Sequence, residues 1–141
     1  MENIPGIFNG FLVWMQSTTT LFLAIFVAIV SFQINHRIKR LYDIKIIINS
    51  LFDLYGNSTV FSDHDPKEAN LQISQEILSL EKMHDQNLFI SREIKRLRDL
   101  RMIYLRVSQG TEVDVEAEMK KIGFHKLGRS FLILAFFNPR T

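Results

Sequence analysis

The chain has 141 residues, a formal net charge of +2 and no cysteine. The lack of cysteine excludes disulfides, thiolate zinc sites and cysteine nucleophiles, and it fits a reducing compartment. Hydrophobic residues make up 47% of the chain, yet the mean hydropathy is only +0.06, because an apolar N-terminal segment is averaged with a charged body. This length and composition predict one membrane helix and one small domain.

An uncharged stretch runs from Phe11 to Ile34. It is long enough to cross the hydrocarbon core of a bilayer, which takes about 20 helical residues. A cleaved signal peptide is the weaker interpretation, because residues 1–10 contain Glu2 but no Lys or Arg, and no small-x-small cleavage site follows the stretch. We therefore predict a tail and transmembrane helix over residues 1–35, followed by a cytoplasmic helical domain over residues 36–141.

Basic residues follow this stretch on one flank only. Arg37, Lys39 and Arg40, which we call the basic collar, are opposed there by a single acid, Asp43. The flank that is rich in Lys and Arg faces the cytoplasm in most membrane proteins. The sequence thus predicts a single-pass protein of a bacterial inner membrane, with its N-terminus outside and its C-terminus in the cytoplasm.

Polar residues in the anchor recur at steps of three and four, which places them on one side of a helix. This polar face consists of Asn9, Gln16, Thr20, Ser31 and Asn35. In one interpretation the face packs against neighbouring helices, with Ser and Thr bonded back to their own helix. In the other, several copies enclose an aqueous pore that these residues line. Both interpretations predict a homo-oligomer in the lipid bilayer, because a single chain offers the polar face no partner.

The helical pattern continues beyond the anchor, with apolar residues at spacings of three and four as far as Tyr55. Gly56-Asn57 is a typical helix stop, since glycine accepts the left-handed conformation. We expect one helix from about Phe11 to Tyr55, roughly 65 Å long, in which residues 36–55 form a stalk. A break near Asn35 is the alternative.

The body has an all-α pattern, with helices expected over residues 67–141. Residues 56–66 predict a loop, and Asp65-Pro66 predicts an N-cap followed by proline at the first helical position. Residues 67–107 contain neither Gly nor Pro and predict one long helix or two in line, with the break between Asp85 and Ser91. Gly110 is expected to end this helical region.

Two short helices are expected after Gly110. Residues 111–114 resemble a capping box opened by Thr111, and Gly123 is expected to end the helix that follows. The apolar run from Phe131 to Phe137 is too short to span a membrane as a helix. We expect a core helix there, bounded by Ser130 and Pro139, with a buried strand or an interfacial segment as alternatives.

No constellation of catalytic or metal-binding residues is complete. The histidines are His36, His64, His84 and His125, and none takes part in an H-E-x-x-H pattern. Asp63-His64-Asp65 is more typical of a solvated loop than of a metal site. Neither a glycine-rich phosphate loop nor a G-x-S-x-G elbow occurs. We predict no metal, no cofactor and no catalytic residue.

Basic residues also gather in the predicted helical region of the body. This basic cluster consists of Arg92, Lys95, Arg96, Arg98 and Arg101. It could meet anionic lipid headgroups or RNA phosphates, although a solvated helix face with local ion pairs is the commoner arrangement. Phe89 and Tyr104 fall at core-like positions rather than at stacking positions, so specific nucleic-acid recognition is not expected. A cytosolic protein is the other candidate partner.

The layout of a membrane helix before a small all-helical cytoplasmic domain resembles the small membrane accessory proteins of type VI-B CRISPR loci. The resemblance implies a divergent HEPN-type domain and assembly into membrane pores that enhance RNA-guided antiviral defence. HEPN ribonucleases carry an Arg a short distance before a His, but Lys120 stands where the Arg preceding His125 would be. We therefore expect a pore-forming or pore-gating protein. A non-conducting adaptor is the first alternative, and a membrane-tethered ribonuclease is the least favoured.

Overall fold

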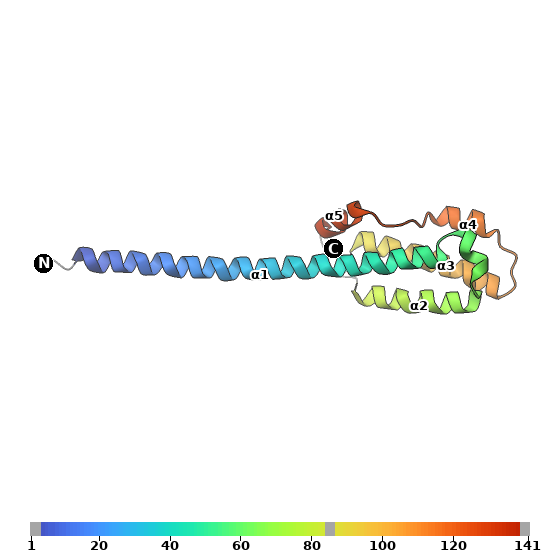
Figure 1. Cartoon of the computed structure of the whole chain (residues 1–141), viewed down its shortest axis with the longest axis horizontal. Coiled ribbons are helices and arrows are strands. Elements are labelled where there is room, and N and C mark those ends of the chain that lie inside the picture. The colour runs from blue at the N-terminus through green and yellow to red at the C-terminus, as the bar shows by residue number, and fades with distance from the viewer. Residues whose placement is uncertain (1–3, 84–86, 139–141) are drawn as a thin grey trace. The chain divides into compact units, whose positions relative to one another are not determined.

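The computed structural model describes residues 4–83 and 87–138, and every regular element in this part of the chain is a helix (Figure 1). The elements are α1 (Ile4–Tyr55), the 3-10 helix η1 (Ser58–Asp63), α2 (Pro66–Met83), α3 (Leu88–Ser108), α4 (Val115–Ile122) and α5 (Arg129–Phe137). The expected all-α fold is confirmed. The expected loop at 56–66 differs, because η1 forms within it after Asn57, whose side chain accepts a hydrogen bond from the Thr59 backbone N–H at 3.2 Å.

Contacts along the chain divide it into two compact units, Met1–Arg37 (unit 1) and Ile38–Thr141 (unit 2). The division falls two residues after the domain boundary that we expected. Helix α1 contributes residues to both units and has no break at Asn35. It reaches further toward the N-terminus than the pattern indicated, since it begins at Ile4 rather than near Phe11.

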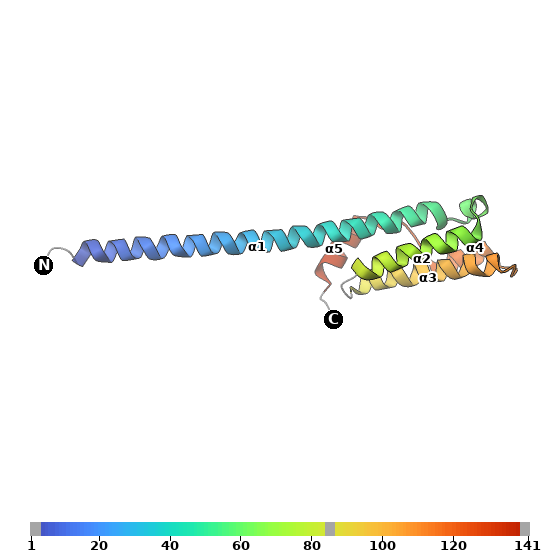
Figure 2. The same cartoon turned by 90° about the horizontal axis from the view of Figure 1, so that it is seen from below.

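Helices α2 and α3 lie side by side in unit 2, as Figures 1 and 2 show. The expectation of one long helix or two helices in line was therefore wrong. Each helix carries an apolar face that an in-line arrangement would leave in water, and pairing the two helices buries both faces. The expected break lies between Met83 and Leu88, where residues 84–86, including His84 and Asp85, are outside the described residues. The start of α2 is as expected, because Asp65 accepts a hydrogen bond from the Lys67 backbone N–H.

The core of unit 2 combines the last part of α1 with α2 and α3. Its largest fully buried apolar side chains are Tyr104, Ile44, Ile48, Ile73, Leu80, Leu97 and Leu100. Tyr104 lies where three elements meet: its ring stacks on Phe61 of η1 at 4.4 Å between centroids and meets Tyr55 of α1 edge to face at 5.7 Å. Its hydroxyl donates to the Tyr55 carbonyl at 3.1 Å, a group that the end of a helix leaves without a helical partner.

Three glycines end helices, but not all for the expected reason. Gly110 has φ +77° after α3, where its N–H donates to the Val107 carbonyl at 3.0 Å, and Gly123 has φ +62° after α4. Both fit the left-handed stop that the sequence predicted. Gly56 does not have a positive φ. It is required instead because a Cβ there would lie 2.7 Å from the Phe52 ring and 2.9 Å from the Phe124 ring.

The two short helices correct two further expectations. Asp114, not Thr111, is the N-cap of α4, since its carboxylate accepts from the Ala117 backbone N–H at 3.1 Å. The predicted last helix is confirmed as α5, beginning at Arg129, while Pro139 is outside the described residues. However, α5 packs on the core with one side only: Phe131 and Ala135 are buried, with Leu132 and Phe136 partly buried against the core, while its other large side chains are exposed.

Two asparagines hold the C-terminal segment in place. Asn49 of α1 exchanges two hydrogen bonds with the backbone of Leu127, accepting from its N–H at 2.7 Å and donating to its carbonyl at 3.2 Å. Asn87, the N-cap of α3, donates to the Ala135 carbonyl at 2.7 Å. The stretch from Leu127 to Ala135, which includes most of α5, is thus fixed at one end to α1 and at the other to the start of α3.

Candidate functional site

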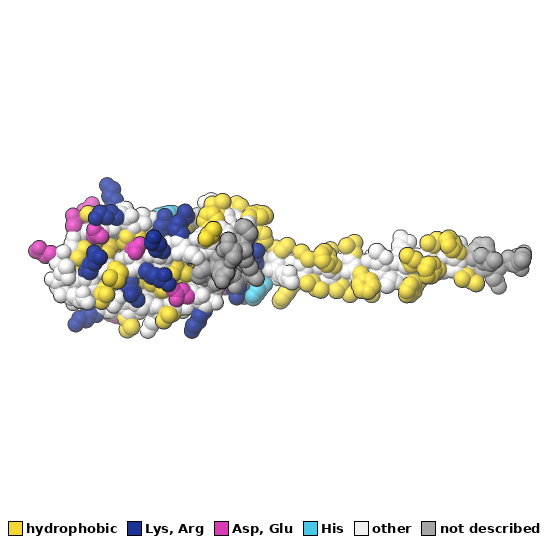
Figure 3. Space-filling model, turned by 180° about the vertical axis from the view of Figure 1, so that it is seen from behind, with side chains coloured by type: hydrophobic (Ala, Val, Ile, Leu, Met, Phe, Trp, Pro, Cys, Tyr) yellow, Lys and Arg dark blue, Asp and Glu magenta, His cyan; other side chains and the backbone are white. Residues whose placement is uncertain are grey.

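The candidate site in unit 1 is the apolar part of α1. No charged residue occurs between Phe11 and Ile34, and the helix is long and apolar enough to cross a membrane by length and composition. Its large hydrophobic side chains are exposed, among them Phe22, Phe26 and Phe32. Figure 3 shows hydrophobic and uncharged side chains along this segment. Such a surface is typical of a helix that is surrounded by lipid.

The structure brings the residues of the polar face to one side of this helix. Because α1 is unbroken, Asn9, Gln16, Thr20, Ser31 and Asn35 fall within an arc of about 100° at 3.6 residues per turn. All five side chains are exposed in the single chain. A helix in lipid would therefore present this arc to whatever lies beside it.

The hydroxyl groups near the middle of α1 are bonded to their own helix. Thr18, Thr19 and Thr20 donate to the carbonyls four residues earlier at 2.5, 2.8 and 2.8 Å, and Ser17 donates to the Trp14 carbonyl at 3.3 Å. The side-chain amides of Asn9, Gln16 and Asn35 differ, because they have no hydrogen-bonding partner within residues 4–83 and 87–138. An unpaired amide in an apolar medium costs several kcal/mol. Of the three amides, only that of Gln16 lies within the uncharged stretch from Phe11 to Ile34, so it is the group on the polar face that most needs a partner.

The basic collar lies where α1 passes from unit 1 to unit 2. Arg37 is the last residue of unit 1, and Lys39 and Arg40 follow in the first turn of unit 2. Lys39 is exposed, while Arg37 and Arg40 are half-buried. Three cations within four residues, directly after an uncharged helix, form the charge pattern that interacts with anionic headgroups.

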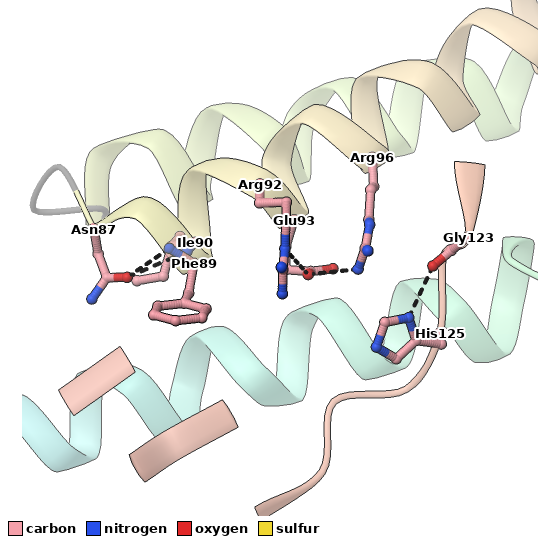
Figure 4. A network of polar contacts seen from close by, with 8 residues as sticks. All are labelled: Asn87, Phe89, Ile90, Arg92, Glu93, Arg96, Gly123 and His125. Carbon is pink, nitrogen blue, oxygen red and sulfur yellow. Dashed lines mark hydrogen bonds and ion pairs between the residues drawn. The ribbon is translucent and has the colours of Figure 1, made fainter. Parts of the chain in front are cut away.

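The structure separates the basic cluster of α3 into two groups. Arg96 and Arg92 approach the same Glu93 oxygen at 2.8 and 3.6 Å, as the dashed lines in Figure 4 show. Arg98 pairs with Glu81 of α2, and the Arg101 guanidinium donates to the Ser74 hydroxyl at 3.4 Å. The exposed Lys95 has no ion-pair partner among the described residues. The cluster is thus two sets of local contacts on different sides of the helix, rather than one continuous cationic surface.

Glu93 is a polar feature that the sequence did not indicate. Its side chain is only 1% exposed, and its second oxygen, Oε2, is buried without a hydrogen bond to any described residue. Removing a carboxylate from water costs several kcal/mol unless a partner compensates, and Arg96 is that partner. An acid among the apolar positions Ile90, Ile94 and Leu97 was the available sign, but only tertiary packing shows that it is buried.

A groove on unit 2 also escaped the sequence interpretation. It has a volume of about 440 Å³ and lies between α2 and α3, and it is lined by Ser74, Ile77, Leu78, Glu81, Arg98, Arg101 and Met102. We call it the α2–α3 groove. Its walls are mainly apolar, and the buried Arg101 Nε has no hydrogen-bonding partner in the described part of the chain.

The three histidines that the structure describes have different surroundings. His125 Nδ1 lies 2.9 Å from the Gly123 carbonyl (Figure 4), the His64 ring contacts Tyr55, and the His36 ring lies near Phe32 on α1. Within the described residues, no group of three or more His, Cys, Asp and Glu side chains could hold a metal ion. Comparison of the chain with protein-family models, with curated proteins and with solved structures found no match.

Proposed function

We propose that the protein is a single-pass inner-membrane protein whose copies assemble through the polar face of α1 and form or gate a pore. The observation that carries this proposal is the unpartnered amide of Gln16 within the uncharged stretch, on the same side of α1 as Asn9 and Asn35 at the two ends of that stretch. In hydrocarbon the Gln16 amide requires another helix or water, and a ring of copies supplies both. The resemblance to accessory proteins of type VI-B CRISPR loci supports the same function, namely membrane perturbation in antiviral defence.

The self-bonded threonines are the arrangement that the packing interpretation predicts, and they fit a pore equally well, so they do not separate the two. Their hydroxyls already donate within the helix, so they contribute little to hydrogen bonding between helices. The long amide side chains remain, and these are well suited to reach water in a lumen. We propose membrane permeation rather than an enzymatic reaction.

The test is the oligomeric state of the purified protein in detergent, followed by its conductance in liposomes. An oligomer that conducts is the expected result. A monomer would refute the proposal, because a single transmembrane helix cannot enclose a pore. An oligomer that does not conduct would favour the second candidate, a non-conducting adaptor, because the α2–α3 groove offers a cytosolic protein an apolar surface with two arginines at its edge.

The orientation has its own test. A reporter fused after Thr141 should be active in the cytoplasm, and one fused before Met1 should be active outside it, because the basic collar follows the apolar helix on one flank only. Changing Arg37, Lys39 and Arg40 together to Glu should weaken this preference. The reverse reporter pattern in the unchanged protein would contradict the proposed topology.

A further inference from the structure

Helix α5 carries an apolar face that unit 2 leaves uncovered. Phe131 and Ala135 pack into the core, while Ile133, Leu134 and Phe137 on the opposite side are 61%, 52% and 77% exposed. No charged residue occurs between Arg129 and the end of the helix. Figure 3 shows hydrophobic side chains gathered at the end of unit 2 that carries α5. A contiguous exposed apolar surface generally marks a binding site for protein or membrane.

The position of α5 within unit 2 follows from its contacts. Tyr55 at the end of α1 meets Tyr104 near the end of α3, and the two helices run in the same direction. Counting back equally far along both helices from this contact places the start of α3 level with the residues of α1 just after Ile38. Asn87, at the start of α3, bonds to Ala135. The exposed face of α5 therefore lies at the Ile38 end of unit 2, where α1 enters it.

The charges of unit 2 are distributed unevenly along the same direction. The Ile38 end carries basic residues in excess: Lys39, Arg40, Lys45, Lys82, Arg92, Lys95, Arg96 and Arg129 stand against Asp43, Glu81 and Glu93. The opposite end is more acidic: Asp63, Asp65, Glu68, Glu112, Asp114, Glu116 and Glu118 stand against Lys67, Arg106, Lys120 and Lys121. An apolar helix face among cations is suited to an anionic lipid surface.

The covalent chain also keeps this end of unit 2 close to the apolar segment. The uncharged stretch ends at Ile34, and unit 2 begins at Ile38, about one helical turn later. This holds for any angle between the two units, because four residues cannot carry the Ile38 end far away. If α1 spans the bilayer, the exposed face of α5 is within reach of the headgroups.

We propose that α5 is an interfacial helix that docks on the cytoplasmic surface of the bilayer, with Ile133, Leu134 and Phe137 at the boundary of the acyl chains. The ligand is a membrane surface containing anionic phospholipid. A second copy of the chain fits less well, since three side chains fall far short of the ~800 Å² per partner that a stable interface buries. The inference rests on the proposed function only in requiring that α1 crosses the membrane.

The test uses the full chain at one copy per lipid nanodisc, in phosphatidylcholine with phosphatidylglycerol. Because the chain has no native cysteine, Leu134→Cys, Leu71→Cys and Phe26→Cys can each carry one fluorophore. Leu71 is the matched control, since it is a leucine of similar exposure on α2. Nitroxides placed on the lipid headgroup or deep in the acyl chain then report the depth of each label.

The headgroup nitroxide should quench most of the emission of the label at position 134. The deep nitroxide should quench the label at position 26, and neither nitroxide should quench the label at position 71. With a label at Phe137→Cys, adding Leu134→Asp should abolish headgroup quenching, whereas adding Leu71→Asp should preserve it. A label at 134 that is not quenched while position 26 is quenched would overturn the interfacial helix and leave the spanning helix intact. A label at position 26 that is not quenched would overturn both the interfacial helix and the spanning helix. If the label at position 134 becomes protected from solvent only when two copies share a disc, the exposed face of α5 serves self-association instead.

Discussion

Tyr104→Ala is expected to lower the free energy of unfolding of unit 2 by about 3 to 5 kcal/mol, which is a large part of the stability of a small domain. The change removes a fully buried ring that contacts Phe61 and Tyr55, and it leaves the Tyr55 carbonyl without its hydrogen bond. Urea unfolding of the full chain in detergent, followed by far-UV circular dichroism, measures the loss. Tyr42→Ala is the matched control, because Tyr42 is 51% exposed in the same unit.

The same residue predicts sensitivity to alkaline conditions. Burial, with the neighbouring Tyr55 phenol as a second cause, raises the pKa of the Tyr104 phenol above its usual value of 10.0. The unfolded chain therefore loses this proton at a lower pH than the folded chain does, so the stability is fully present below pH 10.0 and decreases as the pH rises above it. Tyr104→Phe should cost about 1 kcal/mol at neutral pH and should flatten the alkaline decrease.

A similar loss in Tyr104→Ala and Tyr42→Ala would contradict the place of Tyr104 at the centre of the core. An alkaline profile that is identical in the native chain and in Tyr104→Phe would show that other groups cause the decrease.

Gln16→Leu is expected to abolish most of the conductance of the reconstituted protein while leaving the oligomer intact. If the polar face lines a lumen, the change removes an amide that hydrates the pore, and lumen side chains do not hold the ring together. Thr20→Leu should have a smaller effect, because the Thr20 hydroxyl already donates to the Gln16 carbonyl at 2.8 Å. Single-channel currents and detergent sizing of the same preparation measure both quantities.

Phe26→Leu is the control, since Phe26 is an exposed apolar residue away from the polar face, and it should leave the current unchanged. If Gln16→Leu breaks up the oligomer instead of lowering the conductance of an intact one, the result would contradict the lumen. It would identify the polar face as a packing seam, in which interhelical hydrogen bonds contribute about 1 kcal/mol each.

Local patterns predicted most helix positions and several helix ends. Spacings of three and four identified the helices, and Gly110 and Gly123 stop helices for reasons that involve only their own backbone. The stop at Gly56 shows the limit of such reasoning. The sequence placed it correctly, but the cause includes the Phe124 ring, which comes from a segment far along the chain.

What the sequence did not predict depends on contacts between distant residues. The reversal between α2 and α3, the burial of Glu93 and the α2–α3 groove arise only when the two helices pair. The apolar run of α5 was consistent with a core helix, because composition does not distinguish a helix buried all round from one buried on a single face. The polar face of α1 was recognisable because it depends on the period of a single helix.

The way in which α1 supplies the core of unit 2 has a consequence for biosynthesis. Its buried residues Leu41, Ile44 and Ile48 leave the ribosome well before the α3 residues that cover them, since the contact between Tyr55 and Tyr104 joins positions 49 residues apart. At 5–20 residues per second, this interval lasts roughly 2 to 10 seconds. The apolar segment of α1 has already been synthesised during that time, while the apolar side of residues 36–55 is uncovered. Nascent chains on neighbouring ribosomes are therefore most exposed to mispairing before α3 is synthesised.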